Sequence, residues 1–304
     1  MTSYIVRRLA HVFLTVLAVS MLVFVLLQLS GDPATALLPM EATAADVANL
    51  RAELGLNRPL PEQYLLFLGR AIHGDFGFSY RHREGAMSIV IERMPATLKL
   101  AGAALLVSLV LAIPLGMLGA WRRGSWIDQA AMMVAVTGQS MPTFWMGLML
   151  ILIVAVTFRW LPASGGGDAR SLILPAVTLG ANMAGITARL LRSSLLEVLS
   201  KDYIRVARAK GLVERAVLSH HALRNAALPV VTMIGLQLAY LLAGAIVVET
   251  VFAYPGMGLL VIQAITAHDF PVVQAFVLVF TTMIVLVNLV VDLLYTRLDP
   301  RIAY

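Results

Sequence analysis

The chain has 304 residues, of which 60% are hydrophobic and 13% charged, and its mean hydropathy is +0.85. Soluble domains do not have this composition, so we expect an integral membrane protein embedded in a lipid bilayer. The net charge of +6 is divided among short loops without interleaved aromatic residues, which argues against a nucleic-acid partner. The absence of cysteine excludes disulfides and thiolate metal sites.

Apolar runs of membrane-spanning length predict an all-α fold with six transmembrane helices. We expect them at residues 9–29, 98–120, 130–158, 172–191, 230–248 and 272–294. The first run is longer than a signal-peptide core, and no Ala-x-Ala site follows it, which favours an uncleaved helix. Pro142 lies inside the third run and is expected to kink it.

The longest polar stretch, residues 30–96, is predicted to fold as a small cap of helices. Thr43 and Asp46 have the spacing of a capping box, and Gly55 would end the helix that they begin. Residues 61–73 predict a second, amphipathic helix along the membrane surface, ending at Gly74. Its apolar face is expected to contain Tyr64, Leu65, Leu68 and Ile72.

The last loop between apolar runs, residues 249–271, contains a second short element. Pro255 and Gly256 mark a turn, and residues 259–267 are apolar but only about half a span long. We therefore expect this segment to dip into the membrane or to lie at its face.

The distribution of Lys and Arg predicts the orientation. With both termini in the cytoplasm, the cytoplasmic segments and the inner end of the fourth span, which contains Arg189, hold 14 of the 23 Lys and Arg residues. The two short outer loops then carry only Arg159 and Arg170. Short cytoplasmic loops are enriched in these residues, so this orientation is favoured.

A basic segment, residues 202–229, interrupts the membrane sequence and is predicted to be a cytoplasmic helix–turn–helix. Lys201, Arg205 and Arg208 fall on one face of the first helix, opposite Tyr203, Val206 and Ala207. Gly211 follows Lys210 where a left-handed residue would end the helix. A second helix is expected at about 213–224, and Pro229 would open the next membrane helix.

At these residues the chain resembles a known family. DYIRVARAKGL and HALRNAALP resemble the cytoplasmic EAA loop of permease subunits of bacterial ABC importers, in the oligopeptide, dipeptide and nickel form. GDFGFSY, LPAS, ETVFAYPGMG and the terminal LDPRI also resemble motifs of that family, so the resemblance runs from Tyr4 to Ile302. The general pattern has Glu-Ala-Ala where this chain has Arg205-Val206-Ala207, and a shorter gap to the proline; both departures resemble the peptide-permease form.

The resemblance implies an ABC importer permease of type I-like fold that carries a peptide or a related small solute, with nickel or glutathione as alternatives. It implies an N-terminal helix and structured extracytoplasmic loop over residues 1–96, and a five-helix core over 97–304 with the EAA-type loop at 197–229. The ATPase-coupling loop would use Asp202, Tyr203, Arg205, Ala207, Lys210, Gly211, Glu214, His221, Arg224 and Pro229.

The implied partners are a second, homologous permease, two ATP-binding subunits and an extracytoplasmic solute-binding protein, at the bacterial cytoplasmic (inner) membrane. No phosphate-binding Gly-x-x-x-x-Gly-Lys-Ser/Thr sequence occurs, so ATP and Mg²⁺ are expected on the partner subunits and no cofactor on this chain. The chain is therefore not expected to be an enzyme. Four polar residues within spans could line a pathway or join helices: Gln139, Asn182, Gln237 and Asn288.

Three alternative interpretations carry less weight. Gly165-Gly166-Gly167-Asp168 with Asp292 fits the pattern of an intramembrane aspartyl protease. However, roughly 20–30 Å of bilayer would separate the two carboxylates, which therefore could not share a proton. The adjacent His220 and His221 would point about 100° apart on a helix, a poor arrangement for metal ligands. A non-transport membrane scaffold would show no association with an ATPase.

Overall fold

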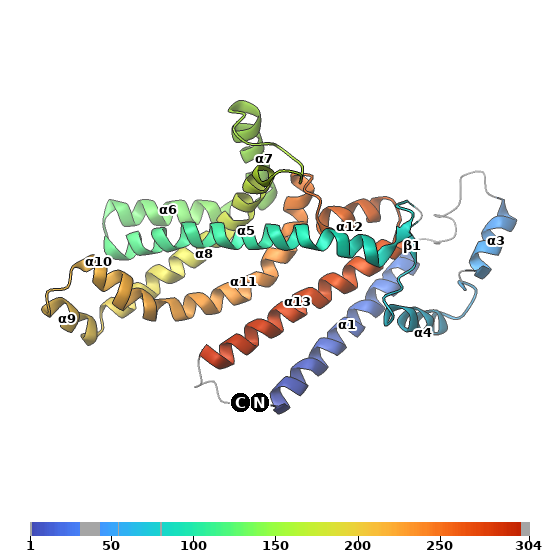
Figure 1. Cartoon of the computed structure of the whole chain (residues 1–304), viewed down its shortest axis with the longest axis horizontal. Coiled ribbons are helices and arrows are strands. Elements are labelled where there is room, and N and C mark those ends of the chain that lie inside the picture. Colours follow the sequence, from blue (N-terminus) through green and yellow to red (C-terminus); the bar gives the residue numbers. More distant parts are fainter. Residues whose placement is uncertain (1, 31–42, 54, 80, 299–304) are drawn as a thin grey trace. The chain divides into compact units, whose positions relative to one another are not determined.

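The computed structural model describes residues 2–30, 43–53, 55–79 and 81–298 (Figure 1). These residues form two compact units, each described here by itself. The first unit contains residues 2–95 and 256–289, and the second contains residues 96–255 and 290–298. Nearly all of the regular structure is helical, as predicted. The described strands form one hairpin, in which each strand is two residues long.

The first unit contains the N-terminal helix and the polar stretch. Its elements are α1 (Thr2–Ser30), α3 (Ala44–Glu53), α4 (Leu60–Ala71), β1 (Phe78–Ser79), β2 (Glu84–Gly85), the start of α5 (Ala86–Trp121), α12 (Met257–Thr266) and most of α13 (Phe270–Leu298). The strands are antiparallel and pair Phe78 with Gly85 and Ser79 with Glu84. The ten-residue α12 confirms the short apolar element that the sequence indicated in the last loop.

The capping box before α3 is confirmed. The Thr43 hydroxyl donates to the Asp46 carboxylate at 2.7 Å, and the Asp46 amide donates back to the Thr43 hydroxyl at 3.3 Å. The Thr43 amide also donates to the Asp46 carboxylate, at 2.9 Å. The two bonds that the carboxylate accepts, from the hydroxyl and from the amide of Thr43, lower the pKa of the Asp46 carboxyl because they favour its charged form. Gly55 ends the segment as expected, with a left-handed φ of +69° that glycine adopts without strain.

Helix α4 packs on the first unit through Tyr64, Phe67 and Leu68. Tyr64 and Leu68 do pack against the cluster of Phe24, Phe67 and Leu278, but the fully inward side chain of α4 is Phe67. Leu65 is 67% exposed and Ile72 is 82% exposed, so these two side chains lie outside the cluster and are free to face a membrane surface. The buried stripe follows the i, i+3, i+4 spacing of Tyr64, Phe67 and Leu68, which places Leu65 and Ile72 on its flank.

The second unit is organised around α8 (Ile173–Leu199), which packs against α6 (Trp126–Ser140) and against α11 (Leu223–Val251). Glycines permit this close packing. A Cβ on Gly180 would collide with the Ala104 carbonyl of α5, and one on Gly185 with the Ala135 carbonyl of α6. Membrane helices commonly pack in this way, because small residues let two backbones approach.

The third predicted span is broken rather than kinked. Helix α6 ends at Ser140, and α7 (Thr143–Leu150) with the π-helix at Ile151–Thr157 continues at an angle of 105°. Pro142 is the N-cap of α7, so it begins a new helix instead of bending one. By length and composition, the described residues hold five helices that could span a membrane, or six if this pair forms one span.

The boundary predicted before the fifth span was wrong. Residues Glu214–Val251 form one continuous helical segment that passes through α10 (Glu214–Ala216), a π-helix (Val217–Ala222) and α11. Pro229 therefore lies inside α11 and does not open it. A membrane helix tolerates an internal proline when neighbouring groups or local π geometry accommodate the lost backbone hydrogen bond.

Candidate functional site

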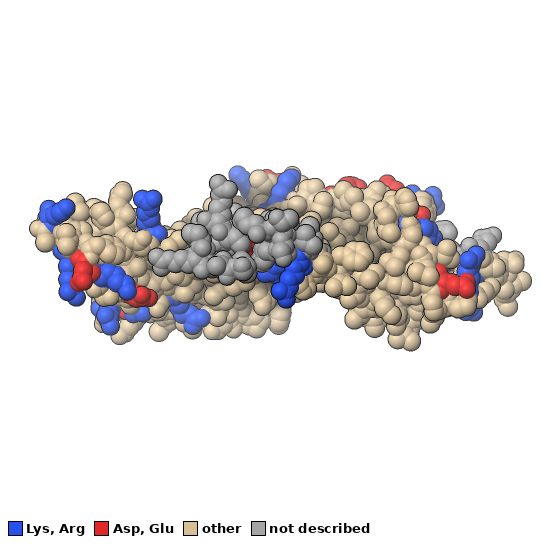
Figure 2. All heavy atoms as spheres, turned by 90° about the horizontal axis from the view of Figure 1, so that it is seen from below, with Lys and Arg blue, Asp and Glu red and all other residues tan. Residues whose placement is uncertain are grey.

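The segment joining α8 to α11 is the candidate site, and it lies entirely within the second unit. Helix α8 ends at Leu199, α9 (Asp202–Ala209) follows, and a turn at Gly211 leads into α10. We call residues 197–229 the coupling segment. Figure 2 shows Lys and Arg, with Asp and Glu among them, over the part of the second unit that carries α9 and α10.

Helix α9 is held by two side chains. Ile204 is fully buried and Ala207 nearly so, both in an apolar cluster with Leu195 of α8 and Val217 and Leu218 of the π-helix. The cluster makes α9 part of the packed unit instead of a loose loop, because burial of an Ile side chain contributes roughly 2 kcal/mol.

The exposed apolar side chains of α9 are Tyr203, at 45%, and Val206, at 54%. The sequence grouped Ala207 with these two residues, but Ala207 faces the cluster instead. The two remaining side chains form a small apolar surface beside the charged residues. A partner can contact this surface without reaching the buried anchors Ile204 and Ala207.

The turn after α9 requires glycine. Gly211 has a φ of +79°, and its amide donates to the Arg208 carbonyl at 2.9 Å, while the Leu212 amide donates to the Ala207 carbonyl at 3.4 Å. This pair of bonds is a Schellman motif, which needs a left-handed residue at the turn. No heavy atom lies within 4 Å of a Cβ placed on Gly211, so backbone conformation, not space, requires the glycine.

A bidentate ion pair spans the turn. Arg208 Nη2 donates to Glu214 Oε1 at 2.7 Å, and Arg208 Nε donates to Oε2 at 3.1 Å. The hydrogen bonds with Glu214 raise the pKa of Arg208 further above its already high value. Both side chains are about 40% exposed, so the pair positions the helices more than it stabilises them.

A second link joins α9 to α11, since Asn225 Nδ2 donates to the Tyr203 hydroxyl at 2.9 Å. The other residues singled out from the sequence lie on the surface of the segment. Asp202 pairs with Arg205 at 3.2 Å, both highly exposed. The exposed residues that remain are Lys210, His221, Arg224 and Pro229.

Sequence reasoning missed Asp128 and Arg192, which form an ion pair between α6 and α8. Asp128 also accepts a hydrogen bond from the Gly124 amide at 2.9 Å. An acidic residue in the first turn of a helix is a common dipole-compensating feature, so no local pattern indicated this long-range contact.

The predicted pathway residues fall into separate contacts. Asn182 Nδ2 donates to the Gln139 carbonyl at 3.0 Å, and Arg189 Nη2 donates to the Gln139 side chain at 2.6 Å. Gln237 is buried and accepts from Thr187 at 3.2 Å. Asn288 lies in the first unit and its side chain is exposed. Three of the four thus lie where polar groups of α6, α8 and α11 meet.

The residues of two rejected interpretations have local roles. Asp168 accepts a hydrogen bond from the Arg170 amide at 3.2 Å and caps the 3₁₀ turn Ala169–Leu172. His220 Nδ1 lies 2.8 Å from the Ser219 hydroxyl, a hydrogen bond to its own neighbour in sequence.

Comparisons with known proteins match this chain to membrane components of transport systems over its full length. Residues 112–304 match the family "Binding-protein-dependent transport system inner membrane component", and residues 1–101 match the corresponding N-terminal family. The chain is 41% identical over 305 residues to the glutathione transport system permease protein GsiC of Escherichia coli K12, and 42% identical to GsiC of Salmonella choleraesuis. Each alignment covers 100% of both chains.

Two solved structures share the fold. An inward-facing structure of the MetNI methionine ABC transporter matches 70% of this chain and 97% of its own, with a TM-score of 0.59 and 18% identity. A crystal structure of an amino acid ABC transporter matches 69% and 94%, with a TM-score of 0.54 and 15% identity.

Proposed function

Because the chain belongs to the family of binding-protein-dependent transport system inner membrane components, we propose that it forms half of the pathway of an ATP-driven importer. The chain is a multi-pass permease subunit, a transport component and not an enzyme. The structural observation that carries the proposal is the coupling segment, in which a short, anchored helix presents Tyr203 and Val206 outward.

The proposed mechanism is alternating access driven by ATP-binding subunits. The Ile204 anchor and the Arg208–Glu214 pair support a rigid coupling segment, so that force on α9 moves α8 and α11 as a body. Tyr203 and Val206, with Asp202, Arg205 and Lys210 around them, would contact the ATPase. Gln139, Asn182, Gln237 and Asn288 would contribute to the pathway or to helix contacts that change during the cycle.

The proposed complex contains this chain, a second permease, two ATP-binding subunits and an extracytoplasmic solute-binding protein. ATP and Mg²⁺ would act on the ATP-binding subunits, since this chain has no phosphate-binding loop. Both termini and the coupling segment would face the cytoplasm of a bacterial cell. Residues 1–96 would form an N-terminal helix and extracytoplasmic cap, and residues 97–304 the permease core.

For the solute, we propose a small peptide, with glutathione as the first candidate. The relatives that are 41–42% identical over their full length are named glutathione transport system permease proteins. Uptake of labelled glutathione, a dipeptide and Ni²⁺ into cells that express the complete transporter decides among the three. Absence of uptake for both peptides would remove the solute proposal and leave the importer proposal intact.

The importer proposal is tested with the assembled complex in proteoliposomes. Gly211→Val should leave the complex assembled but abolish the ATP hydrolysis that the loaded binding protein stimulates, because valine disfavours the left-handed turn. Gly124→Val is the control, since Gly124 has a similar φ of +75° and equally open surroundings but lies outside the coupling segment. Undiminished stimulation in Gly211→Val, or failure to co-purify any ATPase, would refute the proposal.

A further inference from the structure

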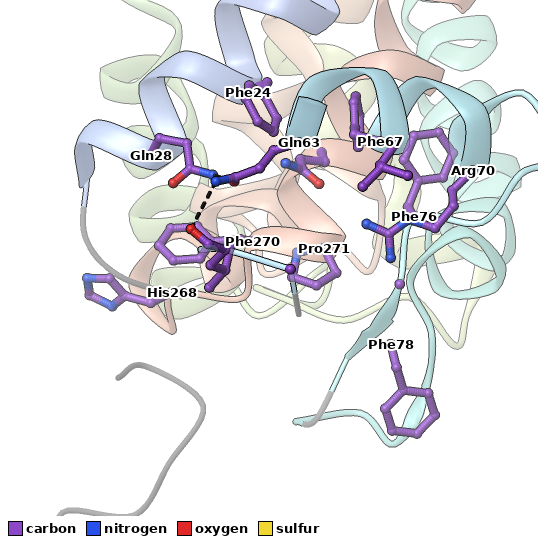
Figure 3. A pocket seen from close by; sticks show the side chains of 15 residues that line it. Phe24, Gln28, Gln63, Phe67, Arg70, Phe76, Phe78, His268, Phe270 and Pro271 are labelled. Atoms are coloured by element: carbon purple, nitrogen blue, oxygen red, sulfur yellow. Dashed lines mark hydrogen bonds between the residues drawn. The ribbon is translucent and has the colours of Figure 1, made fainter. Parts of the chain in front are cut away.

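The first unit contains a pocket that has no role in the mechanism proposed above. It has a volume of about 350 Å³ and is formed by the end of α1, by residues 55–56, by α4, by residues 76–78 and by residues 268–274 (Figure 3). This size is within the range of small-molecule sites. All of its lining residues belong to the first unit, so its shape does not depend on the second.

The lining combines aromatic rings with a few polar groups. Phenylalanines from α1, from α4 and from the segments 76–78 and 268–274 line it: Phe24, Phe67, Phe76, Phe78 and Phe270. Its polar members are Arg70, His268 and the amides of Gln28, Gln63 and Gln274, and none of the described lining residues is a carboxylate. A ligand that fits this lining is apolar over most of its surface and carries one negative charge.

Arg70 supplies the positive charge that would pair with the negative charge of such a ligand. In Figure 3 its guanidinium extends from α4 toward Phe76 at the side of the pocket. A guanidinium presents several donors in a plane and binds phosphate or carboxylate oxygens in pairs. Gln28 donates to Gln63 at 2.9 Å and keeps its own side-chain oxygen as an acceptor for a hydroxyl group.

The position of the pocket along the membrane helices narrows the choice of ligand. Phe24 and Gln28 lie in the last two turns of the apolar span Ala10–Leu29, while Phe270 and Gln274 lie in the first two turns of the span Phe270–Asp292. The pocket is therefore at the level where both spans leave the hydrocarbon. Aromatic and cationic side chains gather at this interface, where lipid headgroups lie.

The apolar surface beside the pocket continues into the span. Leu22, Val25 and Leu29 form an exposed stripe on α1 next to Phe24 and Gln28. Leu66 of α4 lines the pocket and is 46% exposed. An acyl chain that leaves the pocket can follow this stripe, a contact that a water-soluble solute would not make.

We propose that this pocket binds one anionic phospholipid with a hydroxylated headgroup, of the phosphatidylglycerol type. Arg70 binds the phosphodiester, the glutamines hydrogen-bond the headgroup hydroxyls, and the phenylalanines contact the glycerol backbone and the start of an acyl chain. One cation balances one phosphodiester, whereas the ammonium of phosphatidylethanolamine would find no carboxylate among the described lining residues. The lipid belongs to the outer leaflet in the orientation proposed above.

The test uses the assembled transporter, delipidated in detergent and titrated with dioleoyl phosphatidylglycerol under native mass spectrometry. The wild type should retain one phosphatidylglycerol per copy of this chain, about tenfold more tightly than phosphatidylethanolamine. Arg70→Gln should weaken phosphatidylglycerol binding about tenfold, since a charge-assisted hydrogen bond is lost. Arg81→Gln is the matched control, an exposed arginine of the same unit that does not line the pocket.

A second variant tests the choice between headgroups separately from the total amount of lipid bound. Gln274→Leu should reduce the preference for phosphatidylglycerol over phosphatidylethanolamine and keep the total lipid bound. Equal phosphatidylglycerol retention in Arg70→Gln and wild type would overturn the proposal, as would equal losses in Arg70→Gln and Arg81→Gln. Full competition by water-soluble glycerol 3-phosphate would overturn the lipid assignment in favour of a free organic phosphate.

Discussion

Arg192 of α8 holds Asp128 at the start of α6 through two hydrogen bonds of 2.7 Å, from Nε to Oδ1 and from Nη2 to Oδ2. The Asp128 side chain is 6% exposed and the Arg192 side chain is 27% exposed. The pair therefore fastens the start of α6 to the last turns of α8, the helix that leads into the coupling segment.

Asp128→Asn should destabilise the protein by roughly 1–3 kcal/mol. This is less than the cost of breaking a fully buried pair, because the Arg192 guanidinium can still reach solvent. Thermal unfolding of the purified chain in lipid nanodiscs measures the loss. Asp202→Asn removes the partner of an exposed pair and should change the stability by less than about 1 kcal/mol. Equal losses of stability in the two variants would show that the Asp128–Arg192 pair stabilises the protein no more than the exposed Asp202–Arg205 pair does.

Gly185→Ala should disrupt the packing of α8 on α6. Its Cβ would collide with the Ala135 backbone carbonyl, which can retreat only if the two helices separate. We expect the variant to reach the membrane with a greatly lowered melting temperature. Gly102→Ala in α5 provides the comparison, because nothing lies within 4 Å of its Cβ and alanine favours a helix. An unchanged melting temperature for Gly185→Ala would show that these helices pack differently.

Ile204→Ala should loosen α9, because it empties a fully buried site in the cluster that anchors this helix. Substitutions of this kind cost about 2–5 kcal/mol in a packed core. Amide hydrogen exchange over residues 202–209 should therefore increase. Val206→Ala changes an exposed residue of the same helix and should leave exchange unchanged while weakening ATPase coupling. Similar exchange in both variants would show that the cluster does not hold α9.

The absence of cysteine from the chain allows a direct test of orientation. Single-cysteine variants Ser200→Cys and Ser164→Cys place one thiol in the coupling segment and one in the loop after α7, both at exposed positions. A membrane-impermeant maleimide added to intact spheroplasts should label position 164 and spare position 200 until the cells are lysed. Labelling of position 200 in intact spheroplasts would place the coupling segment outside and refute the proposed mechanism.

Local signals in the sequence determined the helical class, most of the spans and several helix ends. Apolar runs identify membrane helices because lipid offers no hydrogen bonds to an open backbone. Thr43, Asp46, Gly55 and Gly211 were predictable as caps because each forms its bonds within a few residues of itself. The same locality made the motif of the coupling segment recognisable.

Tertiary structure decided the features that depend on neighbours. A proline can bend, begin or lie within a helix, and the surrounding packing made Pro142 the start of α7 and Pro229 an interior residue of α11. The Asp128–Arg192 pair and the phenylalanine-lined pocket join residues far apart in the chain. A single sequence records which side chains are present, but only the folded chain brings these distant partners within bonding distance.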